Sequence, residues 1–178
     1  MSLPRLLSLT RRRWAIPLLG DLHRLDGAKF VTLCNRLGAN QGAMRQSLDH
    51  LIEQGFVMRN PGYGHPLRPE YILTPAGAKV APTCVAIDDL AHDLGVRDLC
   101  FRRWSLPVLS VVKPNVDLRF SSIAETLGDI TDRALSIALR DLGAAELLAR
   151  EVVASTPPTT LYRLARHARP LSELAARV

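Results

Sequence analysis

The second half of this chain repeats the first half in register, and this duplication limits what the 178 residues can fold into. Adding 90 to the residue number maps Arg12, Arg13, Trp14, Pro17, Leu19, Phe30, Leu37 and Gly38 onto the identical residues Arg102, Arg103, Trp104, Pro107, Leu109, Phe120, Leu127 and Gly128. After one inserted residue, adding 91 maps Ala43, Leu48, Leu51, Arg59, Tyr71 and Leu73 onto Ala134, Leu139, Leu142, Arg150, Tyr162 and Leu164. A register kept over this length indicates two copies of one folding unit. We expect domains at residues 1–78 and 95–178, joined by a linker helix over residues 79–94.

The centre of each unit is a helix that the sequence predicts to be exposed on one side. In the first unit Asn40 can cap the helix start, and Gly55 stands where the helix would end. Apolar residues recur at three- and four-residue spacing along it, at Met44, Leu48, Leu51 and Ile52. At about 100° per residue, Gly42, Arg45, Gln46 and Asp49 point away from that apolar stripe.

A β-hairpin is predicted directly after this helix. Residues 56–59 and 70–74 look like two short strands, and Asn60-Pro61-Gly62 between them is typical of a turn. Two helices are expected before it, one opened by residues 11–14 and one over about 28–37, and a further helix over about 76–94. This layout predicts an α+β, mainly α fold made of two tandem winged helix-turn-helix domains.

The charge balance favours nucleic acid as a partner. The formal net charge is +6 and the sequence pI is about 9.8, and of the 23 basic residues 20 are arginine. Planar guanidinium groups suit phosphates and guanine edges, although a GC-rich genome would produce the same arginine bias. Composition alone therefore supports DNA binding only weakly.

The cysteines and the hydropathy pattern predict a cytoplasmic protein. Cys34, Cys84 and Cys100 are odd in number and lack CxxC spacing, which argues against a disulfide framework and against a zinc site. No segment approaches 18 uncharged apolar residues, so no membrane span and no membrane partner is expected. We expect a cytoplasmic, nucleoid-associated location.

Several stretches together resemble the HxlR-type winged helix-turn-helix transcriptional regulators of bacteria. They are the Trp14-Ala-Ile-Pro-Leu-Leu helix, Phe30 with Leu33 and Leu37, the run AMRQSLDHLIEQGFV, and Arg68 to Gly77, with a thinner copy of the pattern in the second half. The resemblance implies operator DNA binding by a dimer that forms through its first and last helices. Two copies in one chain depart from that arrangement, so either a monomeric pseudo-dimer or a homodimer is possible.

From this layout we predict which side chains contact DNA. Base edges are assigned to Gln41, Arg45 and Gln46 in the first domain and to Arg133, Ser136 and Arg140 in the second. Phosphates are assigned to Arg12 and Arg13 and to the hairpin arginines Arg59, Arg68, Arg150 and Arg163. Each of these has an ordinary alternative, since exposed arginine and glutamine are normal on any solvated face.

Other chemistry is less well supported. Asp88, Asp89 and His92 share a helix face, but such a face is far more often solvated than metal-binding, and we expect no metal and no cofactor. Cys34 lies on an apolar helix face and is assigned to packing. The sequence contains no recognisable nucleophile with a partner base and no phosphate-binding glycine loop, so we do not expect this protein to be an enzyme.

The sequence therefore predicts a transcriptional regulator, specifically a repressor, that binds duplex DNA with two recognition helices in one chain. The alternative is a tandem winged-helix module for protein contacts, resembling the chromosome-segregation proteins that pair with kleisins, although those tend to be acidic. A mixed case, with one domain on DNA and one on a protein, is suggested by Ile137, an apolar residue at an outward position.

Overall fold

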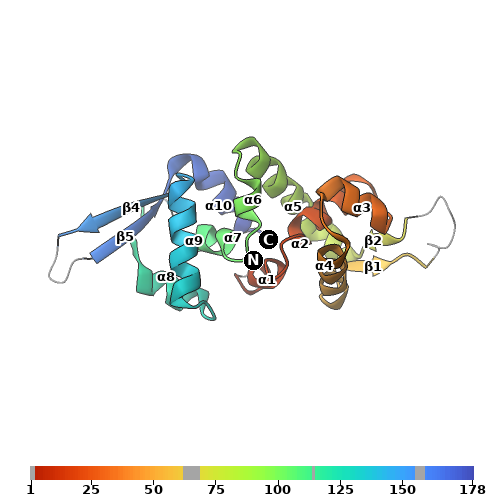
Figure 1. The fold of residues 1–178 in the computed structure, drawn as a ribbon, viewed down its shortest axis with the longest axis horizontal. Helices are drawn as coiled ribbons and strands as arrows, with labels where there is room; N and C mark the ends of the chain where they lie inside the picture. Colours follow the sequence, from red (N-terminus) through yellow and green to blue (C-terminus); the bar gives the residue numbers. More distant parts are fainter. Residues whose placement is uncertain (1–2, 62–68, 114, 155–158) are drawn as a thin grey trace.

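The computed structural model describes residues 3–61, 69–113, 115–154 and 159–178. The two sequence repeats form two helical domains that lie side by side along the long axis of the molecule, each ending in a β-hairpin that points away from the centre (Figure 1). The N- and C-terminal ends of the described chain meet near the middle, where α1 and α10 lie.

The first domain follows the predicted order, with one helix added at its start. Its elements are α1 Leu3–Leu9, α2 Ala15–Arg24, α3 Phe30–Leu37, α4 Gln41–Glu53, β1 Val57–Arg59, β2 Tyr71–Leu73 and α5 Pro75–Asp93. The strands β1 and β2 pair antiparallel, with Arg59 opposite Tyr71. Helix α5 runs without interruption through Pro82.

The second domain repeats this order. Its elements are α6 Arg97–Cys100, α7 Ser105–Val111, β3 Leu118–Arg119, α8 Phe120–Leu127, α9 Asp132–Ala144, β4 Leu148–Val153, β5 Thr159–Leu164, the short 3-10 helix η1 Arg166–Ala168 and α10 Arg169–Ala175. The bounds of α8 are those of α3 plus 90, and the bounds of α9 are those of α4 plus 91. The predicted fold class, two tandem winged helix-turn-helix domains of mainly α structure, is confirmed.

Packing of the helix after each hairpin sets the shape of each domain. In the first domain α5 lies along α2, and in the second α10 lies along α7. Gly77 at the start of α5 passes so close to the hairpin that a Cβ there would overlap the carbonyl oxygen of Phe56. The side chain of Thr74 caps this same helix by accepting from the Gly77 N–H at 3.1 Å.

The two domains meet through helices from both repeats, one of which, α1, was not predicted. Helix α1 of the first repeat packs on α7 of the second, and α10 packs on α5. Two leucines of α1 are buried, Leu6 at 1% and Leu9 at 0% exposure. Because α5 and α10 hold equivalent places in the repeats and also touch each other, the chain has the layout of a dimer within one polypeptide.

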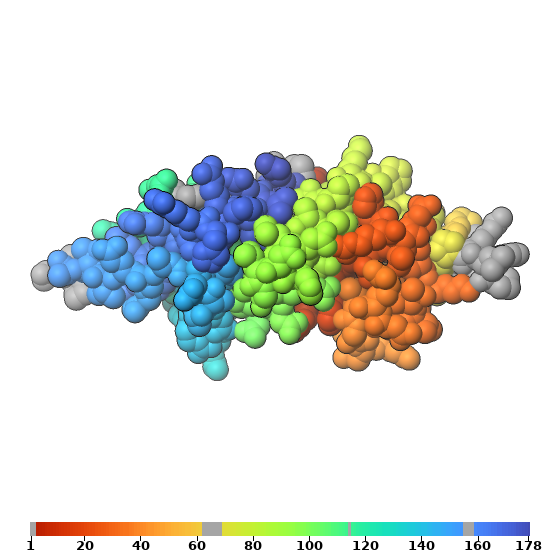
Figure 2. Space-filling model, turned by 90° about the horizontal axis from the view of Figure 1, so that it is seen from above, coloured from red at the N-terminus to blue at the C-terminus, as the bar shows by residue number. Residues whose placement is uncertain are grey.

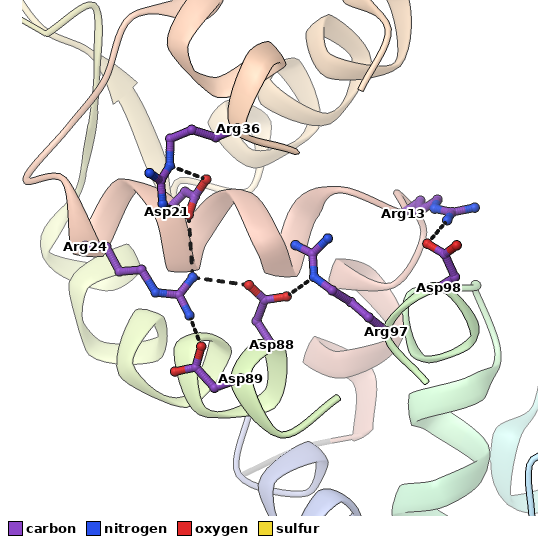
Figure 3. Close-up of polar contacts among 8 residues, drawn as sticks. All are labelled: Arg13, Asp21, Arg24, Arg36, Asp88, Asp89, Arg97 and Asp98. Atoms are coloured by element: carbon purple, nitrogen blue, oxygen red, sulfur yellow. Dashed lines mark hydrogen bonds and ion pairs between the residues drawn. The ribbon is translucent and has the colours of Figure 1, made fainter. Parts of the chain in front are cut away.

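Ion pairs close one side of this junction (Figure 3). Asp88 of α5 accepts from Arg24 of α2 at 3.1 Å and from Arg97 of α6 at 2.6 Å. A second bond joins the repeats directly, since Arg13 Nη2 donates to Asp98 Oδ1 at 2.7 Å. Charged side chains on three helices are thereby held at the point where the first repeat ends and the second begins.

Two details of the sequence-based prediction were wrong. The helix expected to open at residues 11–14 begins at Ala15, and residues 11–14 form turns between it and α1. Helix α1 and its short counterpart α6 were not predicted, because α1 has only seven residues and owes its stability to burial against α7.

Candidate nucleic-acid interface

Helix α4 presents the side chains that the sequence predicts to point outward. The side chain of Asn40 caps the helix by accepting from the Ala43 N–H at 2.8 Å. Met44, Ser47, Leu48 and Leu51 are buried, whereas Gln41, Gly42, Arg45, Gln46 and Asp49 are exposed. The helix therefore has one face in the core and one polar face in solvent, as a recognition helix requires.

Helix α9 is built in the same way in the second domain. Thr131 replaces the asparagine cap, and its hydroxyl accepts from the Ala134 N–H at 3.2 Å. The buried side is Leu135, Ala138, Leu139 and Leu142, and the exposed side is Arg133, Ser136, Ile137 and Arg140. In Figure 2 the orange part of the first domain and the light-blue part of the second, which include α4 and α9, stand out from the same long side of the molecule.

Arg12 is joined to the recognition helix of its own domain. Its Nη1 donates to Gln46 Oε1 at 2.9 Å, from the turn that precedes α2. The bond fixes which end of the Gln46 amide faces outward, because the oxygen is engaged and the amide nitrogen remains available as a donor. Two residues that the sequence assigns to different contacts, one to phosphate and one to a base, thus form one unit.

Arg45 and Arg59 flank the junction between α4 and the hairpin. The Arg45 guanidinium lies 5.2 Å from the centre of the Phe30 ring, and that of Arg59 lies 5.6 Å from the Tyr71 ring. Glu70 accepts from the Phe30 N–H at 3.3 Å and lies 3.9 Å from Arg59. Burial and the nearby Glu70 carboxylate raise the pKa of Tyr71, so its hydroxyl stays protonated beside these cations.

In the second domain Asp141 of α9 holds two arginines, one on α9 and one in the turn before α7. Asp141 accepts from Arg102 at 2.6 Å and from Arg140 at 2.8 Å. Arg102 is the repeat equivalent of Arg12, but with Ile137 in the place of Gln46 it turns to Asp141 instead. Part of the positive charge on α9 is therefore neutralised within the domain.

Two further arginines assigned to DNA are engaged in ion pairs. Arg163 on β5 makes two bonds of 2.7 Å to Asp117, which hold the pKa of that carboxyl below its usual value. Arg13, whose guanidinium lies 5.3 Å from the centre of the Trp14 ring, is bound to Asp98 at the domain junction. In each pair the carboxylate neutralises charge that the arginine would otherwise offer to a phosphate.

Arg150 lies on β4 opposite Tyr162 and lines a hollow of about 440 Å³ between α9 and the hairpin. Ser136 and Arg140 of α9 line the same hollow, so three residues assigned to DNA meet there. Arg133, on the first turn of α9, forms no ion pair within the described ranges. Arg68 lies outside the described residues.

Comparison with known families then identifies the chain. The family model described as HxlR-like helix-turn-helix matches it twice, over residues 9–98 and over residues 99–178. The chain belongs to the HxlR-like helix-turn-helix family. HxlR-like proteins are DNA-binding transcription regulators, so this chain is a DNA-binding regulator that carries two such domains.

Other comparisons add nothing to the HxlR-like assignment. Comparisons with curated proteins and with solved structures found no match. None of the helices in the described ranges is both long and apolar enough to cross a bilayer. The duplicated HxlR-like unit, first inferred from residue spacing, is confirmed by the two adjacent matches.

The two HxlR-like domains carry different side chains on the outward faces of α4 and α9. Position by position, Gly42 corresponds to Arg133, Arg45 to Ser136, Gln46 to Ile137 and Asp49 to Arg140. None of these outward pairs keeps the same residue, although the buried pairs Leu48 and Leu139, and Leu51 and Leu142, do. The helices share a core and differ in what they offer to a ligand.

Sequence reasoning did not identify three residues that shape this interface. Arg102 could have been identified from the repeat, since it is the equivalent of Arg12. Nothing in the sequence pointed to Asp141 or Glu70. Asp141 meets Arg102 across 39 residues of sequence, and Glu70 meets Arg59 across the hairpin, so both contacts depend on the fold. In the structure the interface therefore consists of the predicted polar side chains together with the carboxylates that pair with several of the arginines.

Proposed function

We propose that this HxlR-like chain is a repressor that binds one duplex DNA site with both of its recognition helices. The main support is that α4 and α9 stand out from the same long side of a molecule whose two domains are packed together within one chain. A single duplex running along that side meets both helices at once.

Within this proposal the outward side chains have distinct tasks. Gln41, Arg45 and Gln46 read bases for the first domain, and Arg133, Ser136 and Arg140 do so for the second. Arg12, Arg59, Arg68 and Arg150 hold phosphates, and Arg13 and Arg163 join them where DNA displaces Asp98 and Asp117. Support comes from the exposure of the described members of this set, with Arg12 already bonded to Gln46.

The proposed operator consists of two dissimilar half-sites about one helical turn apart. A homodimer presents identical side chains to both half-sites and selects symmetric DNA, whereas α4 and α9 differ at every outward position compared above. Arginine and glutamine favour guanine and adenine, while Ile137 can only contact a thymine methyl group or another apolar surface. One chain therefore binds its site in one orientation.

In-vitro selection from random duplexes tests this operator directly. We expect an asymmetric consensus, bound by one chain per duplex as measured by analytical ultracentrifugation of the complex. An inverted repeat with equal half-sites, bound by two chains, would show that the same domain is used twice and would exclude the single-chain arrangement. A reporter gene placed behind the selected site then shows whether binding lowers transcription, as a repressor should.

A second candidate function is contact with a protein through the second domain. Ile137 is 41% exposed and borders a hollow of about 260 Å³ whose other walls include Leu99, Trp104 and Ala138. This hollow lies beside α9 and has a mostly apolar lining, which suits an apolar side chain of a partner. If α9 contacts a protein, Ile137→Asp abolishes that contact and leaves the DNA affinity of the first domain intact.

We also propose that the chain consists of a first domain at residues 1–78 and a second domain at residues 95–178, linked by residues 79–94. Helix α5 spans the proposed link and is packed on both domains. Limited proteolysis should therefore leave the link intact, and early cutting between residues 79 and 94 would contradict this picture.

A further inference from the structure

The two repeats differ sharply at one place in the junction. In the first repeat Asp21 of α2 is 3% exposed and is held by Arg36 of α3 at 3.1 Å. In the second repeat, at residue numbers higher by 90, the equivalents of Asp21 and Arg36 are Val111 and Thr126. A charged, hydrogen-bonded cluster in the first repeat thus becomes an uncharged surface at the same place in the second.

The helices that cover this place also differ in length. Helix α5 runs on to Asp93 and covers α2 so closely that a Cβ on Gly20 would lie 3.6 Å from the backbone of Val85. In the same register the equivalents of Gly20 and Val85 are Ser110 of α7 and Ala176, and α10 ends at Ala175, before Ala176. The second repeat therefore keeps an open space where the first is filled.

That space is a hollow of about 630 Å³, which we call the junction hollow. It is lined by Leu3 and Leu6 of α1, by Ser110, Val111 and Lys113 at the end of α7, and by Ala176 after α10, among others. Its volume falls within the range of about 300–1,000 Å³ that small-molecule sites occupy, and such sites often lie between domains. Both repeats contribute walls, since α1 belongs to the first and α7 to the second.

The lining of the junction hollow is mainly apolar but includes the positively charged side chain of Lys113. Lys113 is the single charged side chain among the described lining residues, and within the described ranges it forms no ion pair. Asp117 on the same loop does not neutralise it, because Asp117 is bound twice by Arg163. An apolar wall with one unpaired ammonium group is complementary to a small molecule with an apolar body and one negative charge.

We propose that the junction hollow is a binding site for a small amphipathic organic anion, such as a medium-chain carboxylate. The apolar chain lies against the leucines of α1 and Val111, and the carboxylate meets Lys113. Burial of the chain supplies most of the binding energy, and the ammonium group selects the anion over a neutral molecule of the same length. This site lies apart from the outward faces of α4 and α9.

Isothermal titration of the full chain with octanoate and with neutral 1-octanol tests the site. We expect saturable binding of one octanoate per chain. Lys113→Met should weaken octanoate about fivefold or more and leave 1-octanol unchanged. Ala176→Trp, at an exposed position on the rim, should fill the hollow and abolish binding of both molecules.

The matched control is His23→Met, because His23 is the exposed repeat equivalent of Lys113 in the first domain and should not affect either ligand. Thermal unfolding establishes that each variant folds. Absence of saturable octanoate binding, or binding that survives Ala176→Trp in a folded protein, would overturn the site. Equal losses of octanoate and octanol in Lys113→Met would overturn the charge contact. No DNA is present, so these results are independent of the proposed DNA site.

Discussion

Arg97 Nε donates a 2.6 Å hydrogen bond to Asp88 Oδ1 and so joins the first helix of the second repeat to the last helix of the first. Arg24 approaches the same carboxylate from α2 at 3.1 Å and also pairs with Asp89. Asp88 is 6% exposed, so this is a largely buried carboxylate compensated by two arginines. One carboxylate therefore links α5 both to α2 of the first domain and to α6 of the second.

Removal of this carboxylate should destabilise the junction. Asp88→Ala leaves Arg24 and Arg97, whose side chains are 27% and 30% exposed, without their shared partner. We expect a loss of about 2–4 kcal/mol in the free energy of unfolding, measured by urea titration. Glu173→Ala is the control, since it removes an exposed pair with Arg169 and should cost below about 0.5 kcal/mol. Equal effects would show that Asp88 has no special role.

A methyl group at Gly77 should disturb the contact between α5 and the hairpin. Gly77→Ala places a Cβ against the carbonyl oxygen of Phe56, and backbone atoms cannot give way as a flexible side chain can. We expect destabilisation of about 1–3 kcal/mol in the same assay. Gly42→Ala is the matched control, because its nearest neighbour would be Asn40 Oδ1 at 3.5 Å. That change should stabilise α4 slightly, by up to about 1 kcal/mol.

The DNA-reading role proposed for Arg45 leads to a prediction about specificity. Arg45→Ala should weaken binding to the selected operator by about 1–3 kcal/mol and binding to random duplex much less, as measured by fluorescence anisotropy. Lys79→Ala removes an exposed charge from α5 and serves as the control, with little effect on either DNA. An equal loss on both duplexes would assign Arg45 to phosphate contact instead.

Asp141 on α9 should weaken nonspecific binding to DNA. Asp141→Asn releases Arg102 and Arg140 from their shared carboxylate, which makes both available to phosphates. We expect tighter binding to random duplex and a steeper salt dependence, with the slope of log K against log salt larger by about 1–2. Glu173→Gln frees Arg169 on α10 with the same change in net charge. If both variants tighten binding equally, total charge and not Asp141 controls the affinity.

The recognition helix and the hairpin could be predicted from the sequence because their signals are local. Asn40, the apolar spacing and Gly55 define α4 within a few residues, and the repeat supplies a second, independent copy of the pattern. The burial of Met44 and the exposure of Arg45 follow from the helical period alone.

The side-chain pairs of the site could not be predicted in this way. Arg12 meets Gln46 across 34 residues, and Arg102 meets Asp141 across 39. Such pairs depend on how α2 or α7 crosses the next helices, which no spacing along the chain encodes. Helix α1 was missed for the same reason, since its seven residues are stabilised by contact with the second repeat.

Packing of α10 on α5 within one polypeptide changes how the regulator responds to its own copy number. A homodimeric regulator dissociates when few molecules are present, so its active fraction falls with dilution. Here the partner domain is tethered, and its effective concentration does not depend on expression level. Occupancy of a site should therefore rise in direct proportion to the first few molecules made, without the threshold that subunit assembly imposes. If α4 and α9 bind the two half-sites as proposed, a substitution in α4 changes the recognition of one half-site and leaves that of the other unchanged.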